Sequence, residues 1–193
     1  MGLLKGQSRA VRIIVFISFP LGLLMVAAVL VGVNSFKSYR SVSESMMPCI
    51  DNGDEVFVSR LAYHFLDIER GDVILIDMPA GAGPGVDDRG IVRVVGLPGD
   101  TVEVRGGLTK VNGRLFTVAG DGGMPSYTMP EEEVPPDTLF VLGDNRDLSM
   151  DSHVWGFLPR DNVVGSVLIV YPESGSEMVL AERDSCRAYY AGG

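Results

Sequence analysis

An uncharged apolar run of 21 residues, from Ile13 to Val33, is the feature that most limits how this chain folds. At a rise of ~1.5 Å per residue, a helix of this length reaches ~30 Å, the thickness of the hydrocarbon core of a bilayer. A cleaved signal peptide would have a shorter apolar core, about 7–15 residues, followed by a small-x-small site. The run is longer, and its end offers no such site. We therefore expect an uncleaved transmembrane helix over residues 13–33.

Basic side chains flank this run on both sides. Lys5, Arg9 and Arg12 precede it, whereas Lys37 and Arg40 follow it. The excess on the first side, together with the terminal amine, predicts a cytoplasmic N-terminus over residues 1–12. The rest of the chain is then expected on the outer (periplasmic) face of the inner membrane, with the lipid bilayer as a partner.

Residues 41–193 are acidic, with 11 basic and 25 acidic side chains. This balance argues against a nucleic-acid partner, which would favour a basic face. The two cysteines, Cys49 and Cys186, fit either a disulfide in an exported domain or two unpaired thiols. Their spacing is not that of a zinc site, and we expect no metal.

Short apolar stretches separated by turn residues fill the chain beyond a tether expected at residues 34–42. This pattern is typical of an antiparallel β domain, so we predict a mainly β fold over residues 43–171 and a C-terminal tail over residues 172–193. The predicted strands are Glu55–Ser59, Asp72–Met78, Ile91–Gly96, Thr101–Arg105, Thr138–Leu142 and Val163–Tyr171.

Asn112-Gly113 predicts a β-hairpin between Lys110-Val111 and Arg114-Leu115, because this dipeptide suits a type I′ turn. One helical turn is expected over Leu61–Phe65. Two stretches are predicted to be loops, residues 79–89 and residues 119–136.

Three sequence blocks carry the candidate chemistry. The first includes Ser43 and Ser45, and the others lie far downstream. A serine hydroxyl is a weak nucleophile unless a base takes its proton, and it also needs donors aimed at the developing oxyanion. The blocks read Ser43-Glu44-Ser45-Met46-Met47-Pro48, Arg93-Val94-Val95-Gly96-Leu97-Pro98-Gly99-Asp100 and Gly143-Asp144-Asn145-Arg146-Asp147-Leu148-Ser149-Met150-Asp151-Ser152.

These blocks, in this order after a membrane-length run, resemble type I signal peptidase (leader peptidase), a serine endopeptidase that cuts signal peptides at the outer membrane surface. The resemblance implies the family's antiparallel β catalytic domain, signal peptides of exported preproteins as partners, and no cofactor. It makes Ser45 the nucleophile, and it makes Ser43 with the backbone N–H of Ser45 the oxyanion hole. Met46 and Met47 are expected to line the substrate pocket and to face the membrane. Glu44 stands where the family has glycine.

The position before Arg93 departs from the family. Members have a lysine there, which deprotonates the serine, whereas this chain has Val92. Arg93, expected to support the site, cannot replace the lysine because a guanidinium stays protonated. Loss of the base from a serine hydrolase costs on the order of 10⁴-fold in rate. No shift in alignment restores the lysine, because the chain has lysines only at Lys5, Lys37 and Lys110.

The third block supplies the expected supporting residues. By resemblance Ser149 orients the ammonium of the missing lysine, and Asp144 and Asp151 brace the site, with Arg146 or His153 as partners. His153 stands where the family has arginine. It is an alternative base candidate, although we favour a role as a hydrogen-bond donor to a carboxylate.

The region 54–79 also resembles the family and is expected to provide an edge strand that pairs with the signal peptide. Two functions follow from these residues. The one that the family resemblance favours is a membrane-anchored, signal peptidase I-like serine endopeptidase that cleaves signal peptides with a replaced base. The other is an inactive pseudopeptidase that binds signal peptides or precursors as an escort or regulator.

Overall fold

The computed structural model describes most of the chain, in two units. It describes residues 16–26, 32, 35–79, 82, 88–118, 124–173, 175, 179–180 and 188–190. Met1–Phe36 forms one compact unit and Lys37–Gly193 the other. In the first unit residues 16–26 are helical, with exposed side chains. None of the described helices has the length and apolar character needed to cross a membrane. Of the expected transmembrane helix, residues 13–15, 27–31 and 33 lie outside the described residues.

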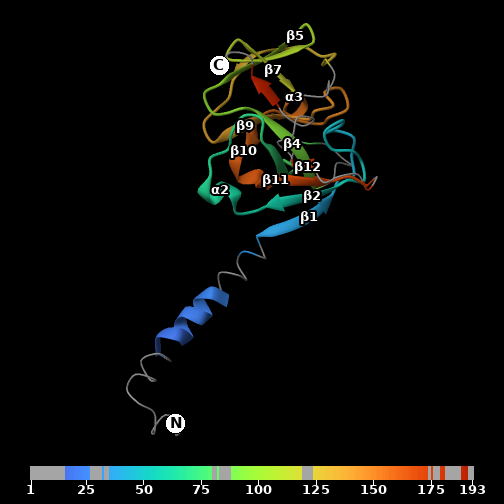
Figure 1. Ribbon diagram of the computed structural model, residues 1–193. Helices are drawn as coiled ribbons and strands as arrows, with labels where there is room; N and C mark the ends of the chain where they lie inside the picture. The colour runs from blue at the N-terminus through green and yellow to red at the C-terminus, as the bar shows by residue number, and fades with distance from the viewer. Residues whose placement is uncertain are drawn as a thin grey trace, which may run out of the picture. The chain divides into compact units, whose positions relative to one another are not determined.

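Two β-sheets make up the second unit (Figure 1). The larger has eight strands in the order β1-β2-β11-β3-β4-β9-β10, with β12 paired to β11, and the smaller has five in the order β13-β7-β6-β5-β8. The larger sheet comprises β1 (Phe36–Arg40), β2 (Glu55–Ser59), β3 (Val73–Asp77), β4 (Arg89–Gly96), β9 (Thr138–Leu142), β10 (Leu158–Pro159), β11 (Val163–Tyr171) and β12 (Val179–Leu180). The smaller comprises β5 (Thr101–Arg105), β6 (Leu108–Val111), β7 (Arg114–Val118), β8 (Met129–Glu133) and β13 (Ala188–Tyr190).

The mainly β prediction is confirmed, and the six predicted strands all form. β2, β5, β9 and β11 have the predicted bounds, whereas β3 and β4 differ at their ends. The predicted hairpin joins β6 to β7 with Val111 opposite Arg114. Its turn residues Asn112 and Gly113 have φ of 50° and 73°, as a type I′ turn requires. Three short helical segments complete the described fold: α2 (Ala62–Phe65), α3 (Ser152–Trp155) and the 3₁₀ turn η1 (Arg160–Asn162).

Strands form in three segments where no strand was predicted, and the predicted loop at 119–136 is wrong. The expected tether contains β1, and the expected loop at 119–136 contains β8. The expected tail contributes β12, which pairs with β11, and β13, which pairs with β7. Each of these segments forms a strand because its backbone completes the hydrogen bonds of a neighbouring strand, a gain that side-chain patterning does not reveal.

The region 54–79 does not supply an edge strand. β2 lies between β1 and β11, and β3 lies between β11 and β4. Among the described strands, β1 and β10 end the main path of the larger sheet, and β12 ends the branch at β11. An extended ligand that adds to this sheet therefore meets β1, β10 or β12, because only an edge strand has unpaired backbone groups.

Alternation along the strands divides the buried side chains between clusters. Leu139 and Val141 of β9 pack with Val92, whereas Phe140 and Leu142 pack in a second cluster. That second cluster also holds residues of the smaller sheet, so it joins the two sheets; it comprises Val95, Val102, Val111, Phe116, Val134, Phe140 and Leu142.

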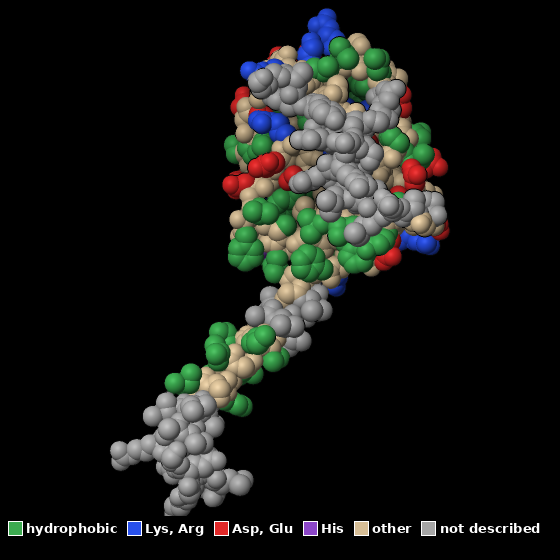
Figure 2. All heavy atoms as spheres, in the orientation of Figure 1, with side chains coloured by type: hydrophobic (Ala, Val, Ile, Leu, Met, Phe, Trp, Pro, Cys, Tyr) green, Lys and Arg blue, Asp and Glu red, His purple; other side chains and the backbone are tan. Residues whose placement is uncertain are grey.

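Surface side chains show no single-sign field on the face drawn in Figure 2. Acidic and basic side chains are interspersed there, and hydrophobic ones gather toward one end of the β domain. Two exposed apolar residues are Phe65 and Leu66, at and just after α2. Apolar groups exposed together in this way mark surfaces that contact a partner or a membrane.

Asp100 fastens the turn that carries the chain from one sheet to the other. Its carboxylate accepts hydrogen bonds from the guanidinium of Arg70, the backbone N–H of Leu97 and the side-chain amide of Asn112. Burial opposes ionisation of this carboxyl, but these hydrogen bonds outweigh it and lower its pKa. The charged form therefore stabilises the folded state.

Asp100→Asn is expected to lower the free energy of unfolding by about 1–3 kcal/mol at neutral pH, because the hydrogen bonds to the charge are lost. A lowered folded-state pKa gives stability that is present above the unfolded pKa of ~3.9 and lost as pH falls through the folded pKa. The difference between variant and unmodified chain should therefore shrink below pH ~4.

Urea unfolding of the full chain, followed by the fluorescence of Trp155, the one tryptophan, measures this difference. Asp161→Asn, at an exposed position in η1, is the matched control and should behave as the unmodified chain. A difference that stays constant from pH 7 to pH 3 would contradict the assignment.

Candidate active site

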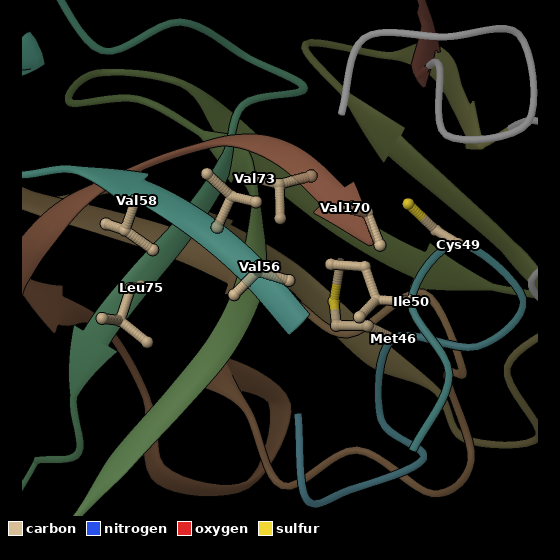
Figure 3. Close-up of a cluster of buried hydrophobic side chains, with 9 residues drawn as sticks. Met46, Cys49, Ile50, Val56, Val58, Val73, Leu75 and Val170 are labelled. Carbon is tan, nitrogen blue, oxygen red and sulfur yellow. The ribbon is translucent and has the colours of Figure 1, made fainter. Parts of the chain in front are cut away.

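A tight loop fixes the segment that carries Ser45. Its first anchor is Ser41, whose backbone N–H donates to the carbonyl of Asp54 at 2.7 Å. After Ser45, the backbone N–H groups of Cys49 and Ile50 donate to the carbonyl of Met46 at 2.9 and 3.0 Å. Met46, Cys49 and Ile50 are buried, and Figure 3 shows them against strands of the larger sheet. The loop is therefore held by packing just beyond the serine.

The two serines of the first block face each other. The hydroxyls of Ser43 and Ser45 are 2.9 Å apart, and the backbone N–H of Ser45 lies 3.4 Å from the Ser43 hydroxyl. Glu44 between them is exposed and is not among the described residues with positive φ. The loop therefore accepts a side chain at this position without backbone strain.

The third block lies directly beside Ser45. The backbone N–H of Asn145 donates to the carbonyl of Ser45 at 2.9 Å. A Cβ built on Gly143 would lie 2.3 Å from the Ser149 hydroxyl and 2.5 Å from the Ser45 carbonyl oxygen. Glycine is required at 143 because Ser149 and Ser45 converge on the space that a side chain would fill.

Val92 lies beside Gly143, on the neighbouring strand β4. Arg93 is in register with Leu142, which sets Val92 opposite Gly143 across the antiparallel pair. Val92 is 3% exposed and packs among the apolar residues of β3 and β9. The structure thus brings together the valine, the serine expected as nucleophile and the serine expected to orient a lysine.

A cavity of about 360 Å³ opens beside these residues. Of its lining residues, Tyr39, Arg40 and Arg89 are the ones with titratable side chains. None of the three is a base at neutral pH, since a phenol and two guanidiniums are protonated there. The described lining is Tyr39, Arg40, Ser41, Val42, Ser43, Ser45, Met46, Leu75, Met78, Arg89, Gly90, Ile91, Val92, Leu148, Ser149 and Met150.

Met46 and Met47 differ in their surroundings. Met46 lines the cavity and is 1% exposed, so it serves both the cavity wall and the core. Met47 is 36% exposed and is not among the lining residues. Of the two expected pocket methionines, the structure brings only Met46 to the cavity.

A buried ion pair between Arg93 and Asp144 joins two segments of the site. Arg93 donates from Nε and Nη2 to the two carboxylate oxygens of Asp144, at 2.7 and 2.6 Å, and both side chains are 1% exposed. A third donor of Arg93 reaches the carbonyl of Gly71 at 2.7 Å. The pair fixes β4, which carries Val92, to the block that carries Ser149.

Asp151 and His153 form a second pair, outside the cavity lining. Asp151 is fully buried and accepts from the backbone N–H of Gly143 at 2.8 Å, while His153 Nδ1 lies 2.7 Å from its other oxygen. The His153 ring stacks on Tyr127 with centroids 4.0 Å apart. The alternative base candidate therefore takes the bracing position and is not among the residues beside Ser45.

Arg146 contacts neither expected carboxylate. Its Nη1 donates to the hydroxyl of Thr109 in β6 at 2.6 Å, and burial lowers the pKa of this guanidinium. Arg146 therefore ties the third block to the smaller sheet. Among the two proposed partners of Asp144 and Asp151, only His153 forms the expected contact.

Sequence reasoning missed several features of the site. Tyr39, Arg40 and Arg89 line the cavity, and Arg89 bonds to Asp77 and to the Tyr39 hydroxyl. No sequence motif marks these residues, because the pairing of β1 and β4 within the sheet, and not their spacing along the chain, brings them to the cavity. Cys49 is disulfide-bonded, and the other cysteine of the chain lies outside the described residues.

Arg93→Met is expected to lower the free energy of unfolding by about 3–5 kcal/mol, because it leaves the Asp144 charge buried without a partner. Arg89→Met, in the same strand as Arg93, removes an exposed pair with Asp77 of the neighbouring strand β3 and should cost at most about 1 kcal/mol. Urea unfolding of both variants measures the two costs. Equal costs would show that the buried pair does not hold the site.

Comparison with known proteins gives consistent matches. Residues 12–172 match the family described as "Signal peptidase, peptidase S26". A protein named "Signal peptidase I" from Leptolyngbya laminosa is 40% identical over 131 residues, which cover 66% of this chain and 64% of that relative. "Probable signal peptidase I-1" of Synechocystis sp. is 38% identical over 159 residues, covering 79% and 81% of the two chains. "Probable signal peptidase I-2" of the same organism is 34% identical over 174 residues, covering 86% and 79%.

Proposed function

This chain belongs to the signal peptidase family, peptidase S26, and we propose that it binds signal peptides of exported preproteins beside Ser45 without cleaving them by the serine–lysine route. One observation carries the proposal. Val92 stands, 3% exposed, in the cavity wall where a proton acceptor is required. The protein is then a pseudopeptidase that escorts or regulates its ligands.

Peptide binding is supported by the shape and lining of the cavity. Its volume, about 360 Å³, falls in the range of ligand sites, ~300–1,000 Å³. Tyr39 and Arg40 of the edge strand β1 line it, so an extended peptide has an unpaired backbone edge to pair with beside Ser45. Leu75 and Ile91 offer an apolar surface for alternate side chains of such a peptide.

Slow cleavage is expected because no base is available to take the proton of the Ser45 hydroxyl. The Ser45 hydroxyl has Ser43 as its hydrogen-bond partner at 2.9 Å, and a second hydroxyl cannot remove its proton at neutral pH. Loss of the base reduces the rate by on the order of 10⁴-fold. A peptide bound at such a site is therefore more often released intact than cleaved.

An active endopeptidase is the second candidate function. It is favoured by the retained pair Ser43 and Ser45 and by the placement of Ser149 beside them. In this case Ser45 attacks the peptide carbonyl, Ser43 and the Ser45 N–H stabilise the oxyanion, and a group from outside the described lining takes the proton.

Anchoring to a membrane is part of the proposal. The apolar run 13–33, with its basic flanks, supports a single-pass anchor with a cytoplasmic N-terminus. The exposed Phe65 and Leu66 support contact of the β domain with the bilayer. The β domain would then act on the outer face of the inner membrane.

Val92→Lys is expected to create cleavage of a preprotein with an Ala-x-Ala site, because it supplies an amine next to Ser45 and Ser149. We expect a gain on the order of 10³-fold or more over the unmodified chain. Full-length protein in mild detergent, with cleavage followed by gel and mass spectrometry, measures it. Ser45→Ala with Val92→Lys is the control and should abolish the gain.

Two results would overturn the pseudopeptidase assignment. One is rapid cleavage by the unmodified chain that Ser45→Ala abolishes, which would establish the second candidate. The other is failure of the unmodified chain to bind a fluorescent signal peptide in an anisotropy titration.

A further inference from the structure

A second cavity is lined by the smaller sheet and by Arg146 of the third block. Its volume is about 130 Å³, and it shares no described lining residue with the cavity beside Ser45. Leu115, Phe116 and Val118 of β7 give it apolar walls, and Arg146 is the one charged residue in its described lining. The cavity is therefore an apolar hollow with a single cation in its wall.

Arg146 is a buried cation without an ionic partner among the described residues. It is 5% exposed, and its Nη1 donates to the hydroxyl of Thr109 at 2.6 Å. None of its other N–H groups has an acceptor in the described part of the chain. Buried charges are normally paired, because removing an ion from water is costly. A guanidinium cannot avoid this cost by losing its proton.

The neighbouring carboxylates of the third block are already engaged. Asp144 accepts two hydrogen bonds from Arg93, and Asp151 lies 2.7 Å from His153 Nδ1. Both carboxylates attract Arg146 from farther away, but burial outweighs this attraction and lowers the pKa of the guanidinium. The described residues therefore leave Arg146 without an anion in contact.

The Tyr127 hydroxyl shows the same shortage of acceptors. It is the buried side-chain polar atom that lacks a hydrogen-bond partner among the described residues. Tyr127 and Arg146 interact electrostatically, so the hydroxyl and the guanidinium belong to one neighbourhood. Buried polar groups without partners are rare in folded proteins, and a missing ion or water explains many of them. Two donors without acceptors in one neighbourhood indicate that an anion is missing.

The unused N–H groups of Arg146 face the cavity. Fully buried side-chain polar atoms without a partner are limited, among the described residues, to the Tyr127 hydroxyl, so these N–H groups are within reach of solvent. Arg146 is otherwise buried and lines the cavity, so solvent reaches its guanidinium through the cavity. A ligand that enters there meets unused donors.

A carboxylate suits this cavity in charge, shape and size. Its two oxygens match the planar fork of a guanidinium, which binds carboxylates through two parallel hydrogen bonds. At ~30 Å³ for each water-sized group, the volume of about 130 Å³ takes a carboxylate with one or two further carbons. The apolar residues of β7 offer those carbons a surface that excludes water.

We propose that this cavity binds the carboxylate of a small ligand, either a free short-chain monocarboxylate or the terminal carboxylate of a peptide. The Nε and Nη2 groups of Arg146 donate to its two oxygens, while Nη1 keeps its bond to Thr109. The short alkyl chain contacts Leu115 and Phe116. This site is separate from the cavity beside Ser45, so it goes beyond the proposed function and does not depend on it.

The test is a titration of the full-length protein in mild detergent with propionate, at constant pH and ionic strength. Binding is followed by saturation-transfer difference NMR and by the thermal midpoint of unfolding. We expect saturable binding with a dissociation constant on the order of 1 mM, and a midpoint that rises with ligand concentration. Propionamide has the same shape without the charge and should not bind. Chloride at the same concentration should leave the midpoint unchanged.

Variants locate the site. Arg146→Met is expected to weaken propionate binding at least about tenfold, because it removes the hydrogen bonds to the charge. Arg105→Met removes a cation that is 78% exposed in β5 of the same sheet and is the matched control, with unchanged binding. Leu108→Trp fills the cavity from a wall position that is 38% exposed, leaves the guanidinium in place, and should weaken binding by a similar factor.

Unchanged affinity in Arg146→Met or in Leu108→Trp would overturn the site. If Arg146→Met does not fold, Leu108→Trp decides the question, because its substituted side chain lies at a partly exposed position.

An N-acetylated alanine dipeptide, compared with its C-terminal amide, separates the two sources of carboxylate. Tighter binding of the dipeptide acid than of propionate assigns the site to chain termini, and binding of propionate alone assigns it to free monocarboxylates. Equal binding of the dipeptide acid and its amide shows that the carboxylate is not recognised and overturns the proposal. No saturable binding of either carboxylate, or an equal response to chloride, also overturns it.

Discussion

The bidentate pair between Arg93 and Asp144 is the interaction on which the site depends. Two charges, each 1% exposed, are removed from water and compensate each other through two short hydrogen bonds. Such a pair is costly to desolvate, and it is strongly destabilising when one partner is removed. Since Arg93 directly follows Val92 and Asp144 directly follows Gly143, the pair sets the register that brings the valine opposite the third block. Asp151, through the N–H of Gly143, fixes the same turn from its other side.

Packing and hydrogen bonds hold the site in place, but proton transfer from Ser45 depends on the side chain at position 92. The loop holding Ser43 and Ser45 is packed by Met46 and Ile50, and Asn145 fixes the Ser45 carbonyl. These contacts position Ser45, the proposed nucleophile, but among the described lining residues they supply no proton acceptor. The positioning of the site and the proton transfer are therefore separable. Positioning rests on burial and hydrogen bonding, whereas proton transfer rests on the group at position 92. This separation explains how a family member can retain its site and lose the serine–lysine route.

Much of the fold was predictable because most of its strands have sequences typical of β-strands, bounded by turn residues. The strand 163–171 is rich in Val and Ile and bounded by turns, and Asn112-Gly113 specifies the hairpin by its left-handed backbone. The strand Met129–Glu133 was not predictable, because proline and three glutamates resemble a loop. It is held by antiparallel pairing with β5, whose paired residues lie 25 to 32 positions earlier, and by no apolar pattern of its own. The strands β12 and β13 depend on long-range pairing in the same way.

The site was predictable in its membership and less so in its contacts. Ser45, Ser149 and Val92 meet as the motifs suggested, but Asp144 pairs with Arg93, and Arg146 reaches Thr109 across 37 positions. Such contacts are set by packing between sheets, which spacing along the chain does not encode. The central claim, that Ser45 has no intrinsic base, is tested most directly by labelling with a serine-directed sulfonyl fluoride across pH 5–9, read by intact-protein mass spectrometry. The account predicts background labelling of Ser45 in the unmodified chain and fast, pH-dependent labelling in Val92→Lys. Fast labelling of Ser45 in the unmodified chain, with a titration between pH 6 and 8, would contradict it.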